Sequence, residues 1–453
     1  SERAMAEIWF FLLVGASIVF VGFLAAQLFD RLRIPDYFIL MAIGLVLGSR
    51  ILPFGGFDPK ASLDVVAPQL TSIALAFILF EGGLVLRVKG MGRMWGAAAL
   101  HTGVAMAFAI GGMWWVGVAL LGLSSTTSLL LALAFCGPSA TIVLSFLPRL
   151  KVREPTRFTL TVEGVMGNVV AAVLVLMIVQ LPGAADVSTW LPYLLLVGVT
   201  IIVAWLVGEA WALLVSGPEP PSFSYMTSVA VAVMLYALGD SPYLGGNGGL
   251  AAFVFGLVLG HRKALAPLRP APVGSRGLQE FHRELVFLLR TFFFIYLGMQ
   301  VQIAGITFTT IVGAVLFTVV FFASRLPSTA VLARMWNLPR LDARVLRATV
   351  ARGMTDTVLI LYAISVGVIG VDAVTGVNEA TFVTDLLFLV ILVAAAASAI
   401  LVFRAEMGAK AEARVAAAVP SVEAPAPAVE SEEITKAVAE FLEDPLVKQG
   451  EID

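Results

Sequence analysis

Residues 134–171 read AFCGPSATIVLSFLPRLKVREPTRFTLTVEGVMGNVVA, and this stretch decides the fold. It holds two apolar segments joined by a basic hairpin at residues 149–157. The first segment is interrupted by the Cys-Gly-Pro sequence of residues 136–138, where a membrane helix would be smooth. The second segment carries Glu163 and, five residues later, Asn168. A broken helix beside a helix with a buried carboxylate is typical of an ion pathway through a membrane.

The composition indicates a protein that crosses the bilayer many times. Of the 453 residues, 59% are hydrophobic and only 13% are charged, and the mean hydropathy is +0.96. Soluble domains are about a quarter charged. The single cysteine, Cys136, excludes an intrachain disulfide and a cysteine metal cluster, and the three histidines show no metal-ligand spacing. The net charge of −2 gives no sign of a nucleic-acid partner, so none is expected.

Apolar segments long enough to cross a bilayer recur along the chain. A transmembrane helix needs about 20 apolar residues, and the short alternating strands of a barrel are missing from the sequence. We therefore expect an all-α polytopic membrane protein, whose first span is retained because no signal-peptide cleavage site follows it. The thirteen predicted spans lie near residues 7–28, 35–52, 69–87, 95–121, 125–147, 158–181, 190–214, 224–239, 245–260, 281–303, 307–329, 344–370 and 380–403.

The basic residues between these spans predict the orientation. Nearly all of them fall on one side of the membrane, whereas the other side has only Arg3, Arg50 and Lys60. The positive-inside rule then places the N-terminus outside and the C-terminus in the cytoplasm. The basic side comprises residues 31–33, 87–93, 149–157, 262–283, 334–347 and 404.

An internal repeat agrees with this count. Residues 44–50 read GLVLGSR and residues 256–262 read GLVLGHR. They end the second and ninth predicted spans, which are an odd number of spans apart and so run in opposite directions. The pattern predicts an inverted repeat, which also relates the fifth span to the twelfth.

The composition changes after Arg404. Residues 404–433 are rich in Ala, Pro, Glu and Ser, which predicts a disordered cytoplasmic linker. Residues 434–453 predict a short acidic amphipathic helix or tail.

Four motifs carry a family resemblance. They are FEGGL at residues 80–84, GGLAAFVFGLVLG at 248–260, RTFFFIYLGM at 290–299 and Arg352-Gly353. In this order they resemble the monovalent cation/proton antiporter family, namely the prokaryotic sodium/proton antiporters related to eukaryotic sodium/hydrogen exchangers. The resemblance covers roughly residues 7–403.

The resemblance implies an architecture. It implies a homodimer among membrane lipids, in which each membrane unit of residues 1–403 has a core part and a dimerisation part. It also implies that the discontinuous fifth and twelfth helices cross at mid-membrane. The implied dimerisation part is residues 7–87 and 224–303, the core part is 95–181 and 307–403, and the linker helix is 190–214.

The resemblance also assigns residues to the site. It makes Glu163 and Arg352 a structural ion pair, which is also expected because neither charge is tolerated alone in hydrocarbon. Gly137 and Pro138 mark the helix break, and the missing proline N–H frees carbonyls that can ligate a cation. Gly137 stands where the family commonly has aspartate. The remaining expected cation ligands at this break are Cys136, Ser139 and Thr141.

Asn168 departs from the family, which has an ion-binding aspartate at this position. An aspartate can bind a cation or a proton in turn, but an amide cannot titrate. Three explanations stay open: an introduced Asp-to-Asn change that disables or traps the protein, a natural protein that does not transport or works differently, or a displaced carboxylate. Asp356 is the candidate for the displaced carboxylate, and its alternative is a helical i, i+4 pair with Arg352.

Two further charged residues are secondary candidates. Glu81 ends an apolar span beside two glycines and fits a packing or mouth residue. Arg290 either approaches the core as a fixed counter-charge or extends to the cytoplasm. His101 is expected to be a buried, hydrogen-bonded side chain rather than a sensor.

The predicted function is exchange of Na⁺ for H⁺ by an elevator movement of the core, in a prokaryotic inner membrane. A K⁺/H⁺ antiporter is the second choice, and a non-transporting sensor on the same scaffold is the rival class. Neither is an enzyme, and no cofactor is expected beside the transported ions. The acidic tail is expected to regulate transport by docking on the basic cytoplasmic loops.

Overall fold

The computed structural model describes most of the chain, and the described part is helical. It describes residues 13, 15–25, 27, 36–48, 59–86, 92–139, 152–181, 187–215, 223–241, 244–245, 247–265, 276–371, 378–418 and 436. Over these residues it has fourteen labelled α-helices, one 3-10 turn and one isolated bridge between Val371 and Asn378, which confirms the all-α prediction. The helices are α2 (Asp36–Gly48), α3 (Pro59–Asp64), α4 (Ala67–Val85), α5 (Gly92–Ala119), α6 (Ser125–Ala134), α8 (Glu154–Gln180), α9 (Val187–Leu214), α10 (Ser224–Gly239), α11 (Gly248–Leu265), α12 (Arg276–Gln300), α13 (Phe308–Trp336), α14 (Arg340–Ala348), α15 (Met354–Ser365) and α16 (Glu379–Ala418), and the turn η2 is Ile303–Gly305.

Six of the described helices are long and apolar enough to cross a membrane. They are α4, α5, α8, α9, α13 and α16, and their mean hydropathies run from 1.5 to 3.0. Six shorter apolar helices accompany them, among them the helical residues 15–25. These lengths and compositions support a membrane protein. The count of thirteen spans stays a prediction.

The chain divides into two compact units, Ser1–Ala405 and Glu406–Asp453. Residues 404–418 belong to helix α16, so the predicted disordered linker is wrong for this part. The sequence there is dominated by Ala, Glu, Lys and Arg, which are strong helix formers, and the last predicted span therefore continues as helix. Apart from Lys436, the rest of the predicted linker and tail lies outside the described residues.

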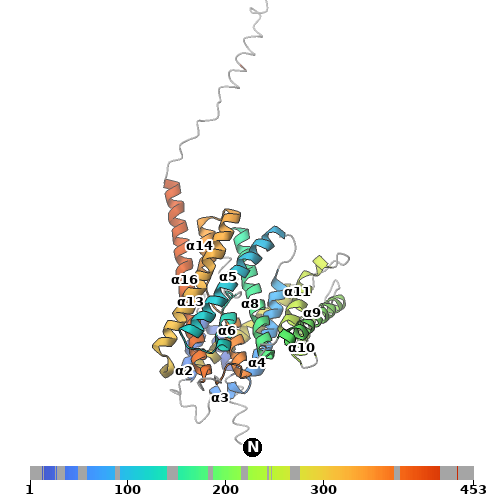
Figure 1. The fold of residues 1–453 in the computed structure, drawn as a ribbon. Coiled ribbons are helices and arrows are strands. Elements are labelled where there is room, and N and C mark those ends of the chain that lie inside the picture. The colour runs from blue at the N-terminus through green and yellow to red at the C-terminus, as the bar shows by residue number, and fades with distance from the viewer. Residues whose placement is uncertain are drawn as a thin grey trace, which may run out of the picture. The chain divides into compact units, whose positions relative to one another are not determined.

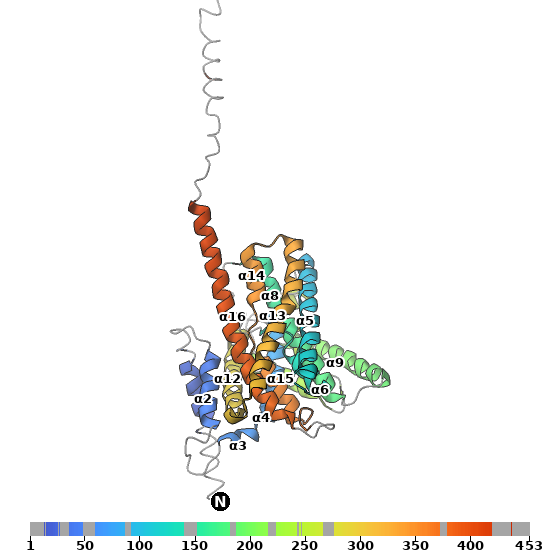
Figure 2. The same ribbon diagram turned by 60° about the vertical axis from the view of Figure 1, so that its left-hand side comes forward.

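Within the first unit, the helices that hold the candidate site run side by side. Helix α5 packs against both α8 and α13, as Figures 1 and 2 show. Helix α2 packs against α12, and α4 packs against α11. Helix α15 contacts α4, α6, α8 and α12, so it lies at the centre of the unit.

The two copies of the GLVLG sequence make the same kind of helix contact. A Cβ at Gly44 would clash with the Ile295 carbonyl oxygen of α12. A Cβ at Gly256 would clash with the Phe80 carbonyl oxygen of α4. Both positions need glycine because two helix backbones touch there, as small residues allow in membrane bundles. The matched contacts are consistent with the predicted inverted repeat.

Helix α6 ends where the sequence indicates a break, and the predicted twelfth span contains two separate helices. Helix α6 ends at Ala134, and residues 135–139 are not helical. Residues 140–151 lie outside the described part of the chain. Helix α14 ends at Ala348, and α15 begins at Met354 after a five-residue non-helical segment.

Candidate functional site

The two non-helical segments meet each other inside the first unit. The Ser139 backbone N–H donates to the Ala351 carbonyl oxygen at 3.1 Å. The Arg352 guanidinium donates in return to the Gly137 carbonyl oxygen. Both carbonyls and the Ser139 N–H belong to broken helices, so these bonds satisfy backbone groups that have no partner within a helix.

Aromatic rings hold the Arg352 guanidinium in place. Its Cζ lies 3.6 Å from the ring centroid of Phe321 and 5.5 Å from that of Phe135. Arg352 is buried, with only 1% of its surface exposed. Cation–π contact is strongest when the cation is desolvated, so this arrangement stabilises a fixed positive charge beside the break.

The break crosses α8 at a contact between two glycines. A Cβ at Gly137 would lie 2.9 Å from the Gly167 Cα, so neither position has room for a side chain. This contact explains why Gly137, and not an aspartate, follows Cys136. Asn168 is the next residue of α8 and is 7% exposed. Among the described residues, no hydrogen-bond partner of its side-chain amide is found.

Asp356 is the buried carboxylate of this region. It is 2% exposed, and its Oδ2 accepts the Gly353 backbone N–H at 3.0 Å. It lies in the first turn of α15, where the helix dipole favours a negative charge. The alternative of a helical i, i+4 pair with Arg352 is wrong, because Arg352 precedes α15 and is not helical. Within the described ranges, no salt bridge joins Asp356 to a basic side chain.

The predicted Glu163–Arg352 pair is wrong, because Glu163 binds a different arginine. Arg325 Nη2 lies 2.6 Å from Glu163 Oε2, with 0% and 1% of the two side chains exposed. Arg325 Nε also donates to the Leu346 carbonyl oxygen at 2.7 Å, near the end of α14. The physical expectation behind the prediction holds, since the buried carboxylate has a cationic partner. That partner comes from α13. Helix α5 packs against both α8, which carries Glu163, and α13, which carries Arg325.

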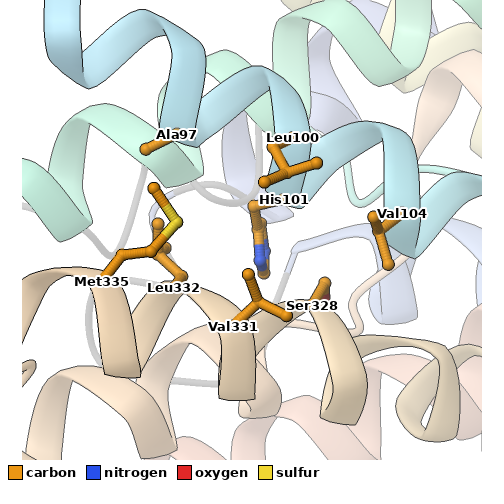
Figure 3. A pocket seen from close by; sticks show the side chains of 8 residues that line it. All are labelled: Ala97, Leu100, His101, Val104, Ser328, Val331, Leu332 and Met335. Carbon is orange, nitrogen blue, oxygen red and sulfur yellow. The ribbon is translucent and has the colours of Figure 1, made fainter.

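His101 of α5 is the third member of this cluster. Its Nε2 lies 3.6 Å from Glu163 Oε2, which is too long for a hydrogen bond. The ring is 2% exposed and lines a shallow pocket between α5 and α13, shown in Figure 3. The other residues of this pocket are Ala97, Leu100, Val104, Ser328, Val331, Leu332 and Met335. The prediction of a buried His101 is correct, but a hydrogen-bond partner is not found for either ring nitrogen among the described residues.

The remaining predicted residues divide into two groups. Cys136 and Ser139 are buried at the break, 1% and 2% exposed, and Thr141 lies outside the described residues. Glu81 is partly buried in α4, within electrostatic range of Arg290 of α12. The Arg290 Cζ lies 5.7 Å from the Phe287 ring centroid. The described contacts of Glu81 and Arg290 do not include Asn168 or Asp356.

Arg325 is the residue that the sequence interpretation missed. A signal was present, since Arg325 lies inside an apolar segment, FFASRLPSTAVLA, and a charge within a predicted span is a site candidate by default. The sequence interpretation gave Arg325 no role and took Arg352 as the partner of Glu163.

Comparisons with known proteins give a family match over most of the chain. The family described as "Sodium/hydrogen exchanger, transmembrane" matches residues 15–404. The K(+)/H(+) antiporter NhaP2 of Shewanella sp. (strain MR-4) is 27% identical over 265 residues, which cover 56% of this chain and 44% of that protein. Na(+)/H(+) antiporter 1 of Methanocaldococcus jannaschii is 24% identical over 300 residues, which cover 64% of this chain and 68% of that protein.

A solved structure has the same fold. The sodium proton antiporter MjNhaP1 from Methanocaldococcus jannaschii, at pH 8, superposes with a TM-score of 0.72 over 87% of this chain and 99% of that one. The identity of 18% means that this likeness shows the fold alone. The match to the NhaP2 relatives spans less than half of their length.

Proposed function

This chain belongs to the sodium/hydrogen exchanger family, and from that premise we propose that it exchanges a monovalent cation for protons across a prokaryotic cell membrane. The relatives are membrane antiporters, some named for K⁺/H⁺ and one for Na⁺/H⁺ exchange. The family is one of transporters and not of enzymes. Sodium is our first choice of cation and potassium the second.

The single observation that carries the proposal is the state of Asp356. A carrier of alternating cation and proton needs a carboxylate that is not neutralised permanently. Glu163 is bound at 2.6 Å by Arg325, and Asn168 cannot titrate. Asp356 is the buried carboxylate of the described break region that lacks a direct salt bridge. We therefore assign the exchangeable charge to Asp356 rather than to Asn168.

The other ligands would come from the break. Ser139 supplies a hydroxyl, and the non-helical segments supply carbonyl oxygens of the kind that coordinate Na⁺ in discontinuous membrane helices. The hydrogen bonds between residues 137–139 and 351–352 support a crossing of the fifth and twelfth spans. Cys136 adds only a soft sulfur, which hard cations disfavour.

The chemistry is competition for one negative charge. A protonated Asp356 and a cation-bound Asp356 carry the same net charge, so either form can be moved through the same low-dielectric interior. The ionised carboxylate without a bound cation or proton costs the most free energy to move through this interior. This cost penalises movement of the core when neither ion is bound. Arg352 supplies a fixed positive charge nearby, and its contact with Phe321 keeps it in place.

The movement itself is proposed as an elevator displacement of the core part against the dimerisation part of a homodimer. The interface between these parts includes the contacts of α15 with α4 and of α8 with α11. We place the C-terminus in the cytoplasm from the basic loops. The Glu154 end of α8 is then cytoplasmic and its Gln180 end is outer.

Purified protein in proteoliposomes with an internal acidic pH and a pH-sensitive dye tests this function. We expect proton efflux when external NaCl is added, a weaker response to KCl, and none to choline chloride. A stronger KCl response would change the cation assignment only. Absence of flux with every cation, in protein that melts cooperatively, would contradict the proposal.

One observation favours the rival class, a non-transporting sensor. Arg352 already occupies the Gly137 carbonyl oxygen that a cation would use, and Asn168 is neutral. A sensor would bind cation without moving it. Such a protein would show cation-dependent melting temperatures together with zero flux.

A further inference from the structure

The connection between α10 and α11 holds the outer end of α8 through Asp240. Asp240 is the residue that follows α10. Gln180 Nε2, at the last position of α8, donates to Asp240 Oδ1 at 2.5 Å. This carboxylate thus accepts a hydrogen bond from the helix that carries Asn168.

Asn247 makes a second link from the same connection. Its Oδ1 accepts the Leu250 N–H at 3.0 Å, which caps the start of α11. Its Nδ2 donates to the Val173 carbonyl oxygen of α8 at 3.2 Å and reaches the Tyr193 hydroxyl of α9 at 3.3 Å. Asn247 is fully buried, so these bonds form without competition from water.

These bonds join the two sets of helices that the proposed movement separates. Helices α8 and α15 carry Asn168 and Asp356, whereas α10 and α11 belong to the predicted dimerisation part. The neighbouring contact is apolar and tight, since a Cβ at Gly249 of α11 would lie 3.1 Å from Leu176 of α8. The only directional contacts described at this end are therefore the polar ones.

We propose that Asp240, Gln180 and Asn247 form an outer latch, which holds the core closed toward the outside and must open before the site can reach that side. The latch residues are positioning residues, and they do not bind the transported ion. The inference rests on the core movement of the proposed function, but its test does not depend on flux.

The chain carries its own probe for this test. Cys136 is its single cysteine, free, 1% exposed and located at the break. A membrane-impermeant maleimide added to the outside of right-side-out vesicles reacts with Cys136 only when the outer path is open. The rate of labelling therefore measures the fraction of open molecules.

Two variants loosen the latch with little change in volume. Gln180→Leu removes the donor on α8, and Gln180→Glu replaces it with a second carboxylate beside Asp240. Ser241→Ala is the matched control, because Ser241 follows Asp240 but its hydroxyl donates to Leu238 within its own turn. Gln180→Glu keeps the size of a partly buried side chain, so it should fold even if Gln180→Leu does not.

We expect outer labelling of Cys136 to rise roughly 5- to 30-fold in each latch variant, the population change that about 1–2 kcal/mol produces. Labelling in Ser241→Ala should match that of the unchanged chain. Equal labelling rates in a folded latch variant and in the unchanged chain would overturn the latch. Raised labelling in a chain that shows no flux would uphold the latch and contradict the proposed function instead.

Discussion

The Glu163–Arg325 ion pair gives a quantitative prediction about stability. Glu163→Gln leaves the Arg325 guanidinium buried without its counter-charge, at a site where 0% of that side chain is exposed. Removing one partner of a buried pair costs about 3–5 kcal/mol. Arg325→Met should cost at least as much, because it also leaves the Leu346 carbonyl oxygen without its donor.

The double variant separates the pair from its surroundings. Once both charges are gone, no uncompensated ion remains, so Glu163→Gln with Arg325→Met should cost less than the sum of the single changes. The coupling energy should approach about 3 kcal/mol, the upper end for residues in direct contact. The control cycle combines Glu163→Gln with Arg352→Met, whose side chains share no salt bridge, and should give less than about 1 kcal/mol.

Equilibrium unfolding in mixed micelles of a mild detergent and SDS provides the assay, with the fluorescence of the eight tryptophans as the signal. Free energies of unfolding from the four members of each cycle give both coupling energies. Additive effects for Glu163 and Arg325, with strong coupling of Glu163 to Arg352, would refute our reasoning and restore the pair expected from the sequence.

Two further predictions concern the helix crossing and the tail. Gly137→Ala should lower the free energy of unfolding by about 1–3 kcal/mol, because its Cβ would lie 2.9 Å from the Gly167 Cα. The control is Gly111→Ala, whose Cβ meets nothing within 4 Å. In the same assay it should be neutral or should raise the free energy of unfolding by up to about 1 kcal/mol. A large loss in the Gly111 variant, or none in the Gly137 variant, would contradict the glycine contact. Truncation after residue 418 should leave the melting temperature unchanged and alter the pH or cation dependence of flux. Identical flux profiles with and without these residues would remove the regulatory role of the tail.

The fold was predictable because its signals are local. Hydrophobic runs locate membrane helices without knowledge of their neighbours, and most of the described helices begin within about five residues of the predicted spans. The end of α6 was predictable for the same reason, since Gly137 and Pro138 weaken a helix from within. The repeat of GLVLG was readable as a pattern, and the helix contacts explain why its glycines are needed.

The partners of the buried charges were not predictable in the same way. The sequence indicates that a buried Glu163 needs a positively charged side chain beside it. Arg325 and Arg352 meet this requirement equally well. The choice depends on how α5 packs against both α13 and α8, which is a property of the assembled bundle. The alanine-rich end of α16 shows a different kind of error. Its composition predicted a disordered segment, but the high helix propensity of its residues makes it helical.

Latch residues illustrate a further gap. Asp240 and Asn247 sit in a short connection, where polar residues usually face solvent and attract no attention. Their partners on α8, the Gln180 side chain and the Val173 carbonyl oxygen, are distant in the sequence and unremarkable in type. Only the position of α8 relative to α10 and α11 gives these residues a shared role.

Sodium-driven proton flux in proteoliposomes containing the unchanged chain, Asp356→Asn or Asn168→Asp tests the central claim most directly. Asp356→Asn keeps an oxygen that can accept the Gly353 N–H and removes only the titrating charge. Our account predicts flux in the unchanged chain and its loss in Asp356→Asn, with cooperative melting retained. Flux that persists in Asp356→Asn, or that is absent until Asn168 becomes aspartate, would contradict the assignment of Asp356 as the exchanging carboxylate.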